Sequence, residues 1–574
     1  MQLKGLGVSP GIGIGRALVV TRGTHRLGFQ IPARRVDAEL ERLAQARARA
    51  REQIARIKQR ITDAAGTEHA YIFEAQRLML DDPMLVDRAA EIVRVDRLNA
   101  ESALERALEE ISALFDRIDD PYLRERKGDV ADVVGRLCMN LRSGGDPIER
   151  FRDVDGPLVL VAEELSPSLI AQLDLHRLAG FVTDAGSWTY HTAILARSIH
   201  LPAVSGVRHA AGVIAPGALI AVDGSAGEVW IDPPPGDLAE LESRSRQRRA
   251  YERSLEDYFT LPPVTMDGTP IRIEANVELP EEAARARRCG AEGIGLYRSE
   301  FLLAGTSAAG LDEEAQYLVY RQLIDGMSGG RVTVRTFDVS EAQMGLTHPG
   351  DAARSPLGLR GLRLSLSFEE VFQAQLRALL RAAAHGSLRI MFPFVTGVEE
   401  LRAARTAVAQ AAETLRARGI PVPDVPIGIM IEVPSAALTI DLLADEADFF
   451  SIGTNDLIQY CLAVDRTDER VSGMYAPLHP AILRVLRHVA RAARRRGLPV
   501  SVCGEMAADP ALLPLLAGLG LREFSMTPSA IPLAKQVVRG LRLSDTARLA
   551  SRALKAATAK EVEQVLTDAM AVKR

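Results

Sequence analysis

IGIMIEVPSAALTIDLLADEADFFSIGTND, residues 427–456, shows the pattern that decides the fold. An apolar run of strand length reaches Glu432, a helix-forming segment follows, and a second apolar run leads to Asn455 and Asp456. The same order recurs from about Val264 onward. Eight strand candidates result: IRIEANV (271–277), GIGLYRSE (293–300), VTVRTFDV (332–339), LRIMFPFV (388–395), IGIMIEV (427–433), FFSIGTND (449–456), VSVCGEM (500–506) and REFSMTP (522–528). Eight strand–helix units predict a TIM (β/α)8 barrel, and a doubly wound sheet, which usually has fewer strands, is the alternative.

Polar residues stand at the ends of these strand candidates, where a TIM barrel carries its active site. They are Arg298, Arg335, Glu432, Asn455, Asp456 and Cys503, with Arg466 one helix later. Three arginines and an amide suit a phosphate and a carboxylate, because guanidinium groups bind such oxyanions through paired hydrogen bonds. Glu432 and Asp456 supply hard oxygen ligands on adjacent strands, which predicts a site for Mg²⁺. Cys503 could protonate an enolate, whereas Cys138 and Cys289 are interpreted as small buried residues.

TDAGSWTYHTAILARSIHLPAVSG, residues 183–206, places His191 on a small-residue turn before a helix-forming run. An imidazole exposed there, with hydroxyls and backbone N–H groups to hold an anion, predicts a covalent nucleophile and not a proton shuttle. A lone histidine of this kind is more often structural, so the prediction depends on the barrel. If the barrel binds a small phosphorylated carboxylate, His191 takes the phosphoryl group and Cys503 protonates the remaining enolate. Phosphoenolpyruvate is the substrate that fits every part.

The pattern divides the chain into a multidomain α/β protein with four parts. They are an α/β domain around His191 (1–21 and 146–232), a helical domain (22–145), a linker (233–263) and the barrel (264–574). In the helical domain, apolar residues from Leu40 to Ile61 recur at three- and four-residue steps. The helical domain is interpreted either as a structural bundle or as a docking surface, and its sequence favours neither. The charged, proline-bracketed linker is predicted to be helical and to let the α/β domain swivel.

The composition excludes several classes of protein. A net charge of −5 over 574 residues leaves no electrostatic footprint for nucleic acid. No apolar run has membrane-spanning length and no N-terminal signal pattern is present, so we expect a cytoplasmic protein without membrane insertion. The four cysteines form no CxxC pair, which argues against a disulfide scaffold or a zinc site. No lysine lies between Lys127 and Lys535, so arginine or backbone must bind any anion there.

Seven motifs together resemble enzyme I of the phosphoenolpyruvate-dependent sugar phosphotransferase system, over essentially the full length. They are TDAG…T-x-HT-x-x-x-ARS-x-x-x-PA (183–203), GIGLYRSEF (293–301), VRTFD (334–338), MFPF (391–394), GIMIEVPSA (428–436), FFSIGTNDLIQYCLAVDR (449–466) and VCGEMA (502–507). The resemblance implies phosphorylation of His191 at Nε2, and proton donation by Cys503 to yield pyruvate. It implies Mg²⁺ on Glu432 and Asp456. Phosphoenolpyruvate would be bound by Arg298, Arg335, Asn455, Asp456 and Arg466. It further implies an HPr-type phosphocarrier docked on the helical domain, and a homodimer formed through the barrel.

The sequence departs from the family pattern at three places. In the nucleophile turn, Ser187, Trp188 and Tyr190 replace a Gly, an Arg and a Ser. After Asp338 the family usually has Gly-Gly-Asp-Lys, where this chain has residues 340–343, Ser-Glu-Ala-Gln. Ser355 replaces an Asn before PLGLR. These changes concern rate, affinity and choice of partner.

Three rival interpretations remain. Phosphoenolpyruvate synthase and pyruvate phosphate dikinase share the histidine domain and the barrel, but they need a large ATP-binding domain, for which the chain has no room before Leu158 and no P-loop. A scaffolding relative would bind HPr-like partners without turnover. A barrel lyase acting on phosphoenolpyruvate or pyruvate would have no use for His191 on a hinged domain.

Overall fold

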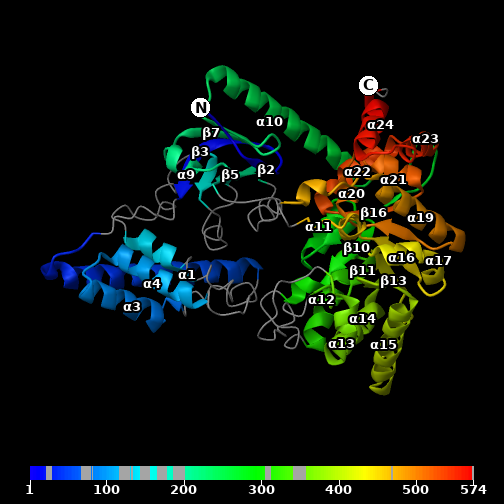
Figure 1. The fold of residues 1–574 in the computed structure, drawn as a ribbon, viewed down its shortest axis with the longest axis horizontal. Helices are drawn as coiled ribbons and strands as arrows, with labels where there is room; N and C mark the ends of the chain where they lie inside the picture. Colours follow the sequence, from blue (N-terminus) through cyan, green and yellow to red (C-terminus); the bar gives the residue numbers. More distant parts are fainter. Residues whose placement is uncertain are drawn as a thin grey trace. The chain divides into compact units, whose positions relative to one another are not determined.

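The computed structural model describes residues 1–20, 29–65, 79–80, 82–115, 130, 133–141, 156–163, 177–184, 201–303, 312–339, 357–466 and 470–571. The chain divides into two compact units, Met1–Tyr251 and Glu252–Arg574, each with its own fold (Figure 1). Within the described ranges, no helix combines the length and the apolar character needed to cross a membrane.

The first unit contains an eight-stranded mixed sheet in the order β1-β8-β7-β3-β4-β5-β6-β2. Its strands are β1 (Gln2–Lys4), β2 (Leu6–Ser9), β3 (Ile12–Val20), β4 (Leu158–Ala162), β5 (Leu178–Thr183), β6 (Ala203–Ser205), β7 (Leu219–Asp223) and β8 (Glu228–Ile231). The N-terminal residues 2–20 form three of these strands. β3 lies in the middle of the sheet, parallel to β4 and antiparallel to β7. The N-terminal segment therefore completes a sheet whose other strands come from beyond residue 156.

The glycines of GIGIG allow close packing of β3 against neighbouring backbone. A Cβ on Gly13 would lie 1.9 Å from the carbonyl oxygen of Ala179, and one on Gly15 would lie 2.5 Å from that of Pro157. Both distances are shorter than any side chain permits, so glycine is required there. These glycines therefore belong to a strand and not to a phosphate-binding loop.

The helical part of this unit contains η1 (Ala33–Arg35), α1 (Val36–Ala65), α3 (Pro83–Val95), α4 (Ala100–Phe115) and a further helical stretch at 133–141. Leu43, Ala50 and Ile54 of α1 pack in one apolar cluster with residues of the other helices, as the three- and four-residue spacing predicts. Pro83 occupies the first turn of α3, and the Asp82 side chain accepts a hydrogen bond from the N–H of Met84 at 2.9 Å. Pro121 and the side chains of Ile57 and Ile61 lie outside the described residues.

α9 (Ala210–Val213) is a short turn of helix, and α10 (Pro235–Leu255) with η4 (Glu256–Tyr258) confirms that the segment predicted as a linker is helical. α10 is fixed to the sheet along its first half. Arg244 Nη2 lies 2.5 Å from Oδ2 of the buried Asp223, and the Ser245 hydroxyl donates to the carbonyl of Ile12 at 3.2 Å. Any swivelling would therefore have to occur beyond these contacts.

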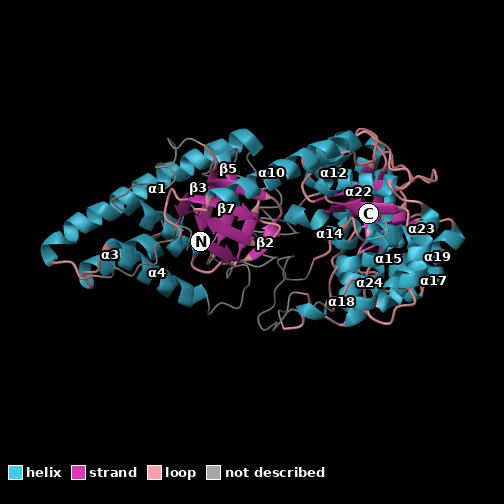
Figure 2. Cartoon of the chain, turned by 90° about the horizontal axis from the view of Figure 1, so that it is seen from above, coloured by secondary structure: helices cyan, strands magenta, loops and turns pink. Residues whose placement is uncertain are grey.

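The second unit is a closed barrel of eight parallel strands, which confirms the predicted fold and excludes the doubly wound sheet. Figure 2 shows strands of this unit in magenta among the cyan helices that cover them. The strands are β9 (Arg272–Val277), β10 (Gly293–Arg298), β11 (Arg331–Arg335), β12 (Leu388–Phe392), β13 (Ile427–Ile431), β14 (Phe449–Ile452), β15 (Val500–Val502) and β16 (Glu523–Met526). The α-helices are α11 (Glu282–Arg288), α12 (Glu313–Met327), α13 (Leu362–Ser367), α14 (Glu369–Ala382), α15 (Val398–Ala417), α16 (Pro434–Leu438), α17 (Ile440–Leu443), α18 (Thr454–Leu462), α19 (Pro480–Arg496), α20 (Glu505–Ala508), α21 (Leu513–Leu519), α22 (Ile531–Arg539), α23 (Leu543–Ala553) and α24 (Ala559–Ala571). Short 3-10 turns are η5 (Ser299–Leu303), η7 (Ala383–His385), η8 (Ser472–Met474) and η9 (Pro528–Ala530).

All the barrel strands except β9 end earlier than the sequence candidates, and this corrects the predicted places of several site residues. β14 ends at Ile452, and Asn455 and Asp456 belong to the first turn of α18. β15 ends before Cys503. The physical reason is that helical hydrogen bonding begins at once: the N–H of Leu457 donates to the carbonyl of Gly453, one residue past the strand. Asn455, Asp456 and Cys503 therefore follow the strands, whereas Arg298 and Arg335 are the last residues of β10 and β11.

Candidate active site

A chain of alternating charges crosses the carboxyl-end mouth of the barrel. Its members are Glu278, Arg298, Glu300, Arg335, Asp338, Arg360 and Asp456, in order of contact. Arg298 lies between two carboxylates, with Nη1 3.1 Å from Glu278 and Nε 2.9 Å from Glu300. The charge chain therefore consists of three guanidinium groups and four carboxylates. The sequence placed Arg298, Arg335 and Asp456 at the mouth, but it did not predict the ion pairs that join them.

Arg335 is the buried centre of this chain. Its Nη2 pairs with Glu300, its Nη1 lies 3.0 Å from Asp338, and Nη1 also contacts the sulfur of Met430 at 3.6 Å. Burial would lower the pKa of Arg335, but the carboxylates of Glu300 and Asp338 outweigh burial and raise it. Arg335 Nε and Glu300 Oε2 are buried and have no hydrogen-bond partner among the described residues. Such unsatisfied atoms at a cavity mouth are those that a polar ligand would satisfy.

Arg360 is a site residue that the sequence reasoning missed. Its guanidinium donates to both oxygens of Asp338, lies 3.9 Å from Asp456, and donates from Nη1 to the Tyr460 hydroxyl oxygen at 3.3 Å. The ring of Phe394 lies beneath it, 5.1 Å from Cζ. Arg360 is the last residue of the motif PLGLR, which follows Ser355. An arginine at the end of this motif, between strand candidates three and four, is the signal that could have found it.

Glu432 and Asp456 are the predicted metal ligands. The side chain of Glu432 is buried, and its Oε1 accepts a hydrogen bond from the N–H of Phe394 at 2.7 Å. Burial, together with the charges of Asp338 and Asp456, raises the pKa of Glu432 to about 8. In the described part of the chain, no three potential metal ligands come together. Two hard carboxylate donors in an excess of negative charge fit a divalent cation that takes its other ligands from substrate and water.

Cys503 follows β15 and lies among apolar side chains. Its cluster contains Leu296, Met391, Met430 and Phe449. The sulfur contacts the carbonyl oxygen of Ile452 at 3.5 Å. Burial raises the pKa of the thiol to about 11, although the hydrogen bond with the Ser451 hydroxyl acts to lower it. The group is therefore a protonated thiol at neutral pH, which is the state that a proton donor needs.

Asn455 and Arg466 differ in how firmly the structure places them. The Asn455 side-chain oxygen accepts from the N–H of Glu505 at 3.1 Å, and the Tyr475 hydroxyl donates to its backbone carbonyl at 3.5 Å. Arg466 is exposed, and its backbone N–H donates to Gln459 at 3.4 Å. Burial and the charge of Glu505 raise the pKa of Tyr475 to about 12, while the positive charge of Arg466 lowers it. The Arg466 side chain therefore lies close enough to the Tyr475 ring to affect its titration. No contact in the described residues joins Arg466 to the other arginines.

The predicted nucleophile His191, with Ser187, Trp188 and Tyr190, lies outside the described residues, as do 340–343 and Ser355. The structure describes the strand that leads to the histidine turn, because β5 ends at Thr183. Asp184 follows and caps α9 through the N–H groups of Ala210 and Ala211, the latter at 3.2 Å. The start of the turn is thus anchored on the sheet.

Three family models match this chain in the order of its parts. The phosphoenolpyruvate-utilising enzyme N-terminal model matches residues 4–126, the mobile-domain model matches 154–227, and the phosphoenolpyruvate-binding domain model matches 252–543. The last of these alone covers more than half of the sequence. The three matches run along nearly the whole chain.

Full-length relatives agree with these matches. A phosphoenolpyruvate-protein phosphotransferase of Geobacillus stearothermophilus is 40% identical over 529 residues, 92% of this chain and 91% of the relative. One of Haemophilus influenzae is 37% identical over 570 residues, 99% of each chain. A solution structure of enzyme I is 29% identical and covers 43% of this chain and 99% of its own, with a TM-score of 0.35. On the strength of the full-length relatives, this chain belongs to the phosphoenolpyruvate-protein phosphotransferase family.

Proposed function

We propose that this chain transfers the phosphoryl group of phosphoenolpyruvate to its own His191, releasing pyruvate, and then to a histidine of an HPr-type phosphocarrier. The observation that carries the proposal is the alternating charge chain from Glu278 to Asp456, beside Glu432 and Cys503 at one barrel mouth. Family membership supports the same reaction.

The arginines bind and orient the substrate. Each guanidinium is fixed by carboxylates before substrate arrives, so little side-chain freedom is lost on binding. Arg298 and Arg335 share Glu300, and Arg335 and Arg360 share Asp338, so all three move as one group. Phosphate and carboxylate oxygens suit their unfilled N–H groups.

Mg²⁺ held by Glu432 and Asp456 would offset the negative charge of the mouth and of the phosphoenolpyruvate oxygens. The residues fit this group, because the charge chain carries one carboxylate more than it has guanidinium groups, and Glu432 adds a fifth carboxyl. A trianionic substrate would be repelled by these residues alone. The exposed Arg466, one helix after Asp456, would add a further positive charge to the bound substrate.

The chemical step balances with the residues named. Nε2 of His191 forms a bond to phosphorus while the bond from phosphorus to the enol oxygen breaks, and the electron pair stays on that oxygen. The thiol of Cys503 then gives its proton to the terminal carbon, which completes pyruvate. The apolar cluster around Cys503 excludes water from the thiol and keeps the proton on sulfur until the enolate forms.

The experiment that tests the proposal labels the protein with phosphoenolpyruvate carrying ³²P in the phosphate, with Mg²⁺ present. Acid-labile label is expected on the wild type, is removed by added pyruvate, and is absent from His191→Ala. His209→Ala, another histidine of the same unit, is the matched control and keeps the label. Normal labelling of His191→Ala would refute the nucleophile, and a wild type that never labels would favour a scaffold without turnover.

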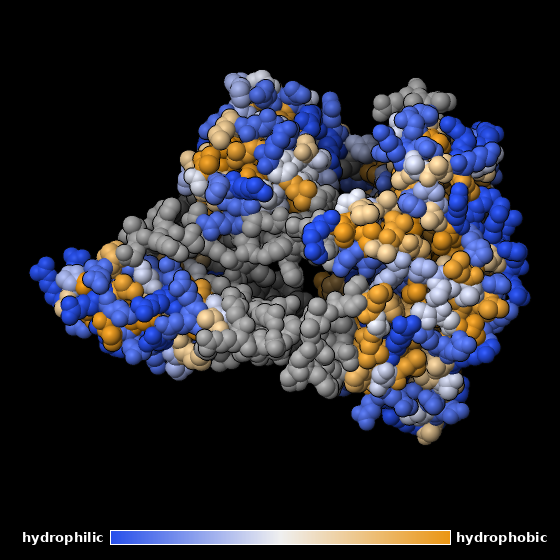
Figure 3. Space-filling model, in the orientation of Figure 1, coloured by the Kyte–Doolittle hydropathy of each residue, from blue (hydrophilic) through white to orange (hydrophobic). Residues whose placement is uncertain are grey.

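We also place the phosphocarrier on the helices α1, α3 and α4, a homodimer contact on the barrel, and the protein in the cytoplasm. Exposed leucines on the barrel support the dimer: Leu357 is 64% exposed, Leu438 69% and Leu442 56%. Figure 3 shows hydrophobic surface among hydrophilic residues on the second unit. Exposed apolar side chains of this size favour burial against a partner.

A further inference from the structure

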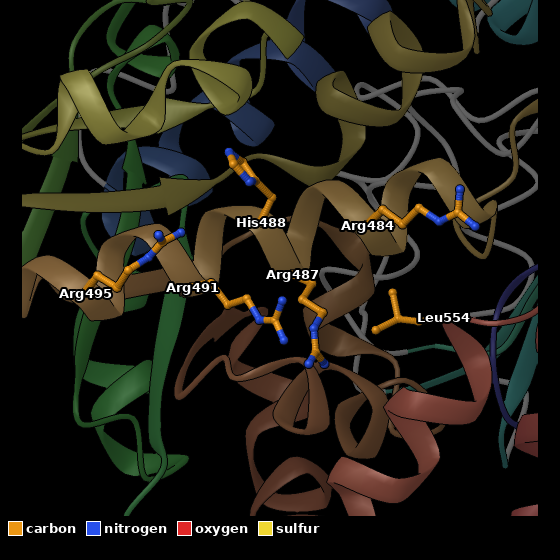
Figure 4. Close-up of a pocket in the computed structure, with 6 residues that line it drawn as sticks. All are labelled: Arg484, Arg487, His488, Arg491, Arg495 and Leu554. Atoms are coloured by element: carbon orange, nitrogen blue, oxygen red, sulfur yellow. The ribbon is translucent and has the colours of Figure 1, made fainter.

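A hollow of about 270 Å³ lies on the outer helix layer of the second unit, beside α19. Five of its lining residues come from α19 and the sixth, Leu554, follows α23 (Figure 4). The α19 residues are Arg484, Arg487, His488, Arg491 and Arg495. None of the site residues described above belongs to this lining.

The spacing of these residues explains why they share one face. Steps of three, four, seven and eleven residues from Arg484 follow one side of an α-helix and give a stripe about 16 Å long. The opposite side carries Ile482, Leu486 and Val489, which are buried in the barrel's core. α19 contains no Asp or Glu along its whole length. Burial of the apolar side thus forces the arginines together on the outside.

The arginines of the hollow have no acidic partner. Among the described residues, no ion pair or hydrogen bond is formed by the side chains of Arg484, Arg487, Arg491 and Arg495. The neighbouring Arg496 does form an ion pair, with its Nη1 2.9 Å from Oδ1 of Asp445.

The close-up shows Arg487 and Arg491 extending to the same side of α19, toward Leu554 (Figure 4). Two converging positive charges repel each other unless an anion lies between them.

We propose that this hollow binds a small polyanion that carries two linked phosphate groups, such as an inorganic or organic diphosphate. Two convergent guanidinium groups can each hold one phosphate through paired hydrogen bonds. The volume admits a small molecule, and Leu554 offers a limited apolar contact for an organic part.

Acidic residues at the margins argue against a long polyanion. Asp445 is paired with Arg496 near one end of the stripe, and Asp568 lies 3.9 Å from Arg552 of α23. A nucleic acid or an extended acidic peptide would have to pass these carboxylates. The proposal does not depend on the chemistry of His191.

The test is calorimetric titration of the full chain with sodium pyrophosphate, without Mg²⁺ and at low salt. Wild type is expected to bind, and R487A/R491A to bind about tenfold or more weakly, because two charge-assisted contacts are lost. R321A/R402A removes two exposed arginines elsewhere on the same unit and keeps wild-type affinity, which controls for net charge.

Four outcomes would overturn the proposal. They are no binding to wild type, equal binding by R487A/R491A, orthophosphate binding as tightly as pyrophosphate, and tighter binding of oligoglutamate or a short DNA duplex. Equal binding by R487A/R491A would mean that pyrophosphate occupies the barrel mouth instead. Circular dichroism of each variant confirms that it is folded.

Discussion

Arg360 holds Asp338 through both carboxylate oxygens, with Nη2 2.9 Å from Oδ1 and 3.0 Å from Oδ2. Arg335 reaches the same carboxylate from β11, with Nη1 3.0 Å from Oδ2. Burial would raise the pKa of Asp338, but the two arginines outweigh it and lower the pKa. Asp338 therefore stays ionised and fixes two guanidinium groups at the mouth of the barrel.

Arg360→Gln is expected to lower kcat/KM for phosphoenolpyruvate by about 10- to 100-fold, mostly through a higher KM. The reason is the loss of one charge-assisted contact to substrate, worth about 1.5–3 kcal/mol. Steady-state kinetics of phosphoryl transfer measures both constants.

Arg363→Gln is the matched control for this prediction. Arg363 also lies over the ring of Phe394, at 5.4 Å, but it pairs with Glu400, outside the charge chain. A similar loss of kcat/KM in both variants would show that stacking on Phe394 matters, and not the contact with Asp338.

Glu300→Gln is expected to destabilise the barrel unit by about 3 kcal/mol and to weaken substrate binding. Glu300 Oε1 accepts hydrogen bonds from both Arg298 and Arg335, and the side chain of Arg335 is only 7% exposed, so the change leaves a buried positive charge with one partner fewer. Denaturant unfolding and the KM for phosphoenolpyruvate report the two effects.

Glu278→Gln provides the comparison. Glu278 ends the charge chain, contacts Arg298 alone within it and is 41% exposed, so its loss costs less than about 1 kcal/mol. If both substitutions destabilise equally, the position of Glu300 between two arginines has no special role.

Periodicity alone predicts the eight barrel strands, and barrel topology then places Glu432 and Cys503 at one mouth. That step needs no contact information, because parallel strands in a closed sheet end on the same side. The ion pairs could not be predicted in this way. Arg360 lies 22 residues from Asp338 in the chain, and no periodicity of the sequence indicates that the two are in contact. The predicted end of β14 is too far along the chain because helical hydrogen bonding begins at Gly453, directly after the last strand residue, Ile452.

The free energy of unfolding of the metal-free protein is expected to decrease as pH rises from about 5 to 8. The pKa of Glu432 is raised to about 8 by burial and by Asp338 and Asp456, whereas an unfolded Glu titrates near about 4.3. Between these values the folded state retains a proton that the unfolded state has lost, so stability is greatest below the lower value and decreases toward the higher one.

Calorimetric melting at pH 5.5 and 8.5 measures this dependence. Mg²⁺ is expected to raise the melting temperature more at pH 8.5, because the ionised carboxylate binds the cation. Glu432→Gln should lose both the pH dependence assigned to this group and the Mg²⁺ effect. A variant that still responds to Mg²⁺ as the wild type does would exclude Glu432 as a ligand.

Cys503→Ala is expected to slow pyruvate formation by about 100-fold or more while the Kd for phosphoenolpyruvate changes less than threefold, since general acid catalysis contributes only to the transition state. Single-turnover assays of pyruvate, with phosphohistidine measured in parallel, separate proton donation from phosphoryl transfer. The wild-type rate should show no titration of this thiol between pH 6 and 9, because its pKa is about 11. Cys461→Ala, on α18, is the control: burial also raises the pKa of its thiol, yet the rate stays unchanged. Equal losses of rate and affinity in Cys503→Ala would assign the thiol to packing with Leu296 and Met430 and not to proton donation.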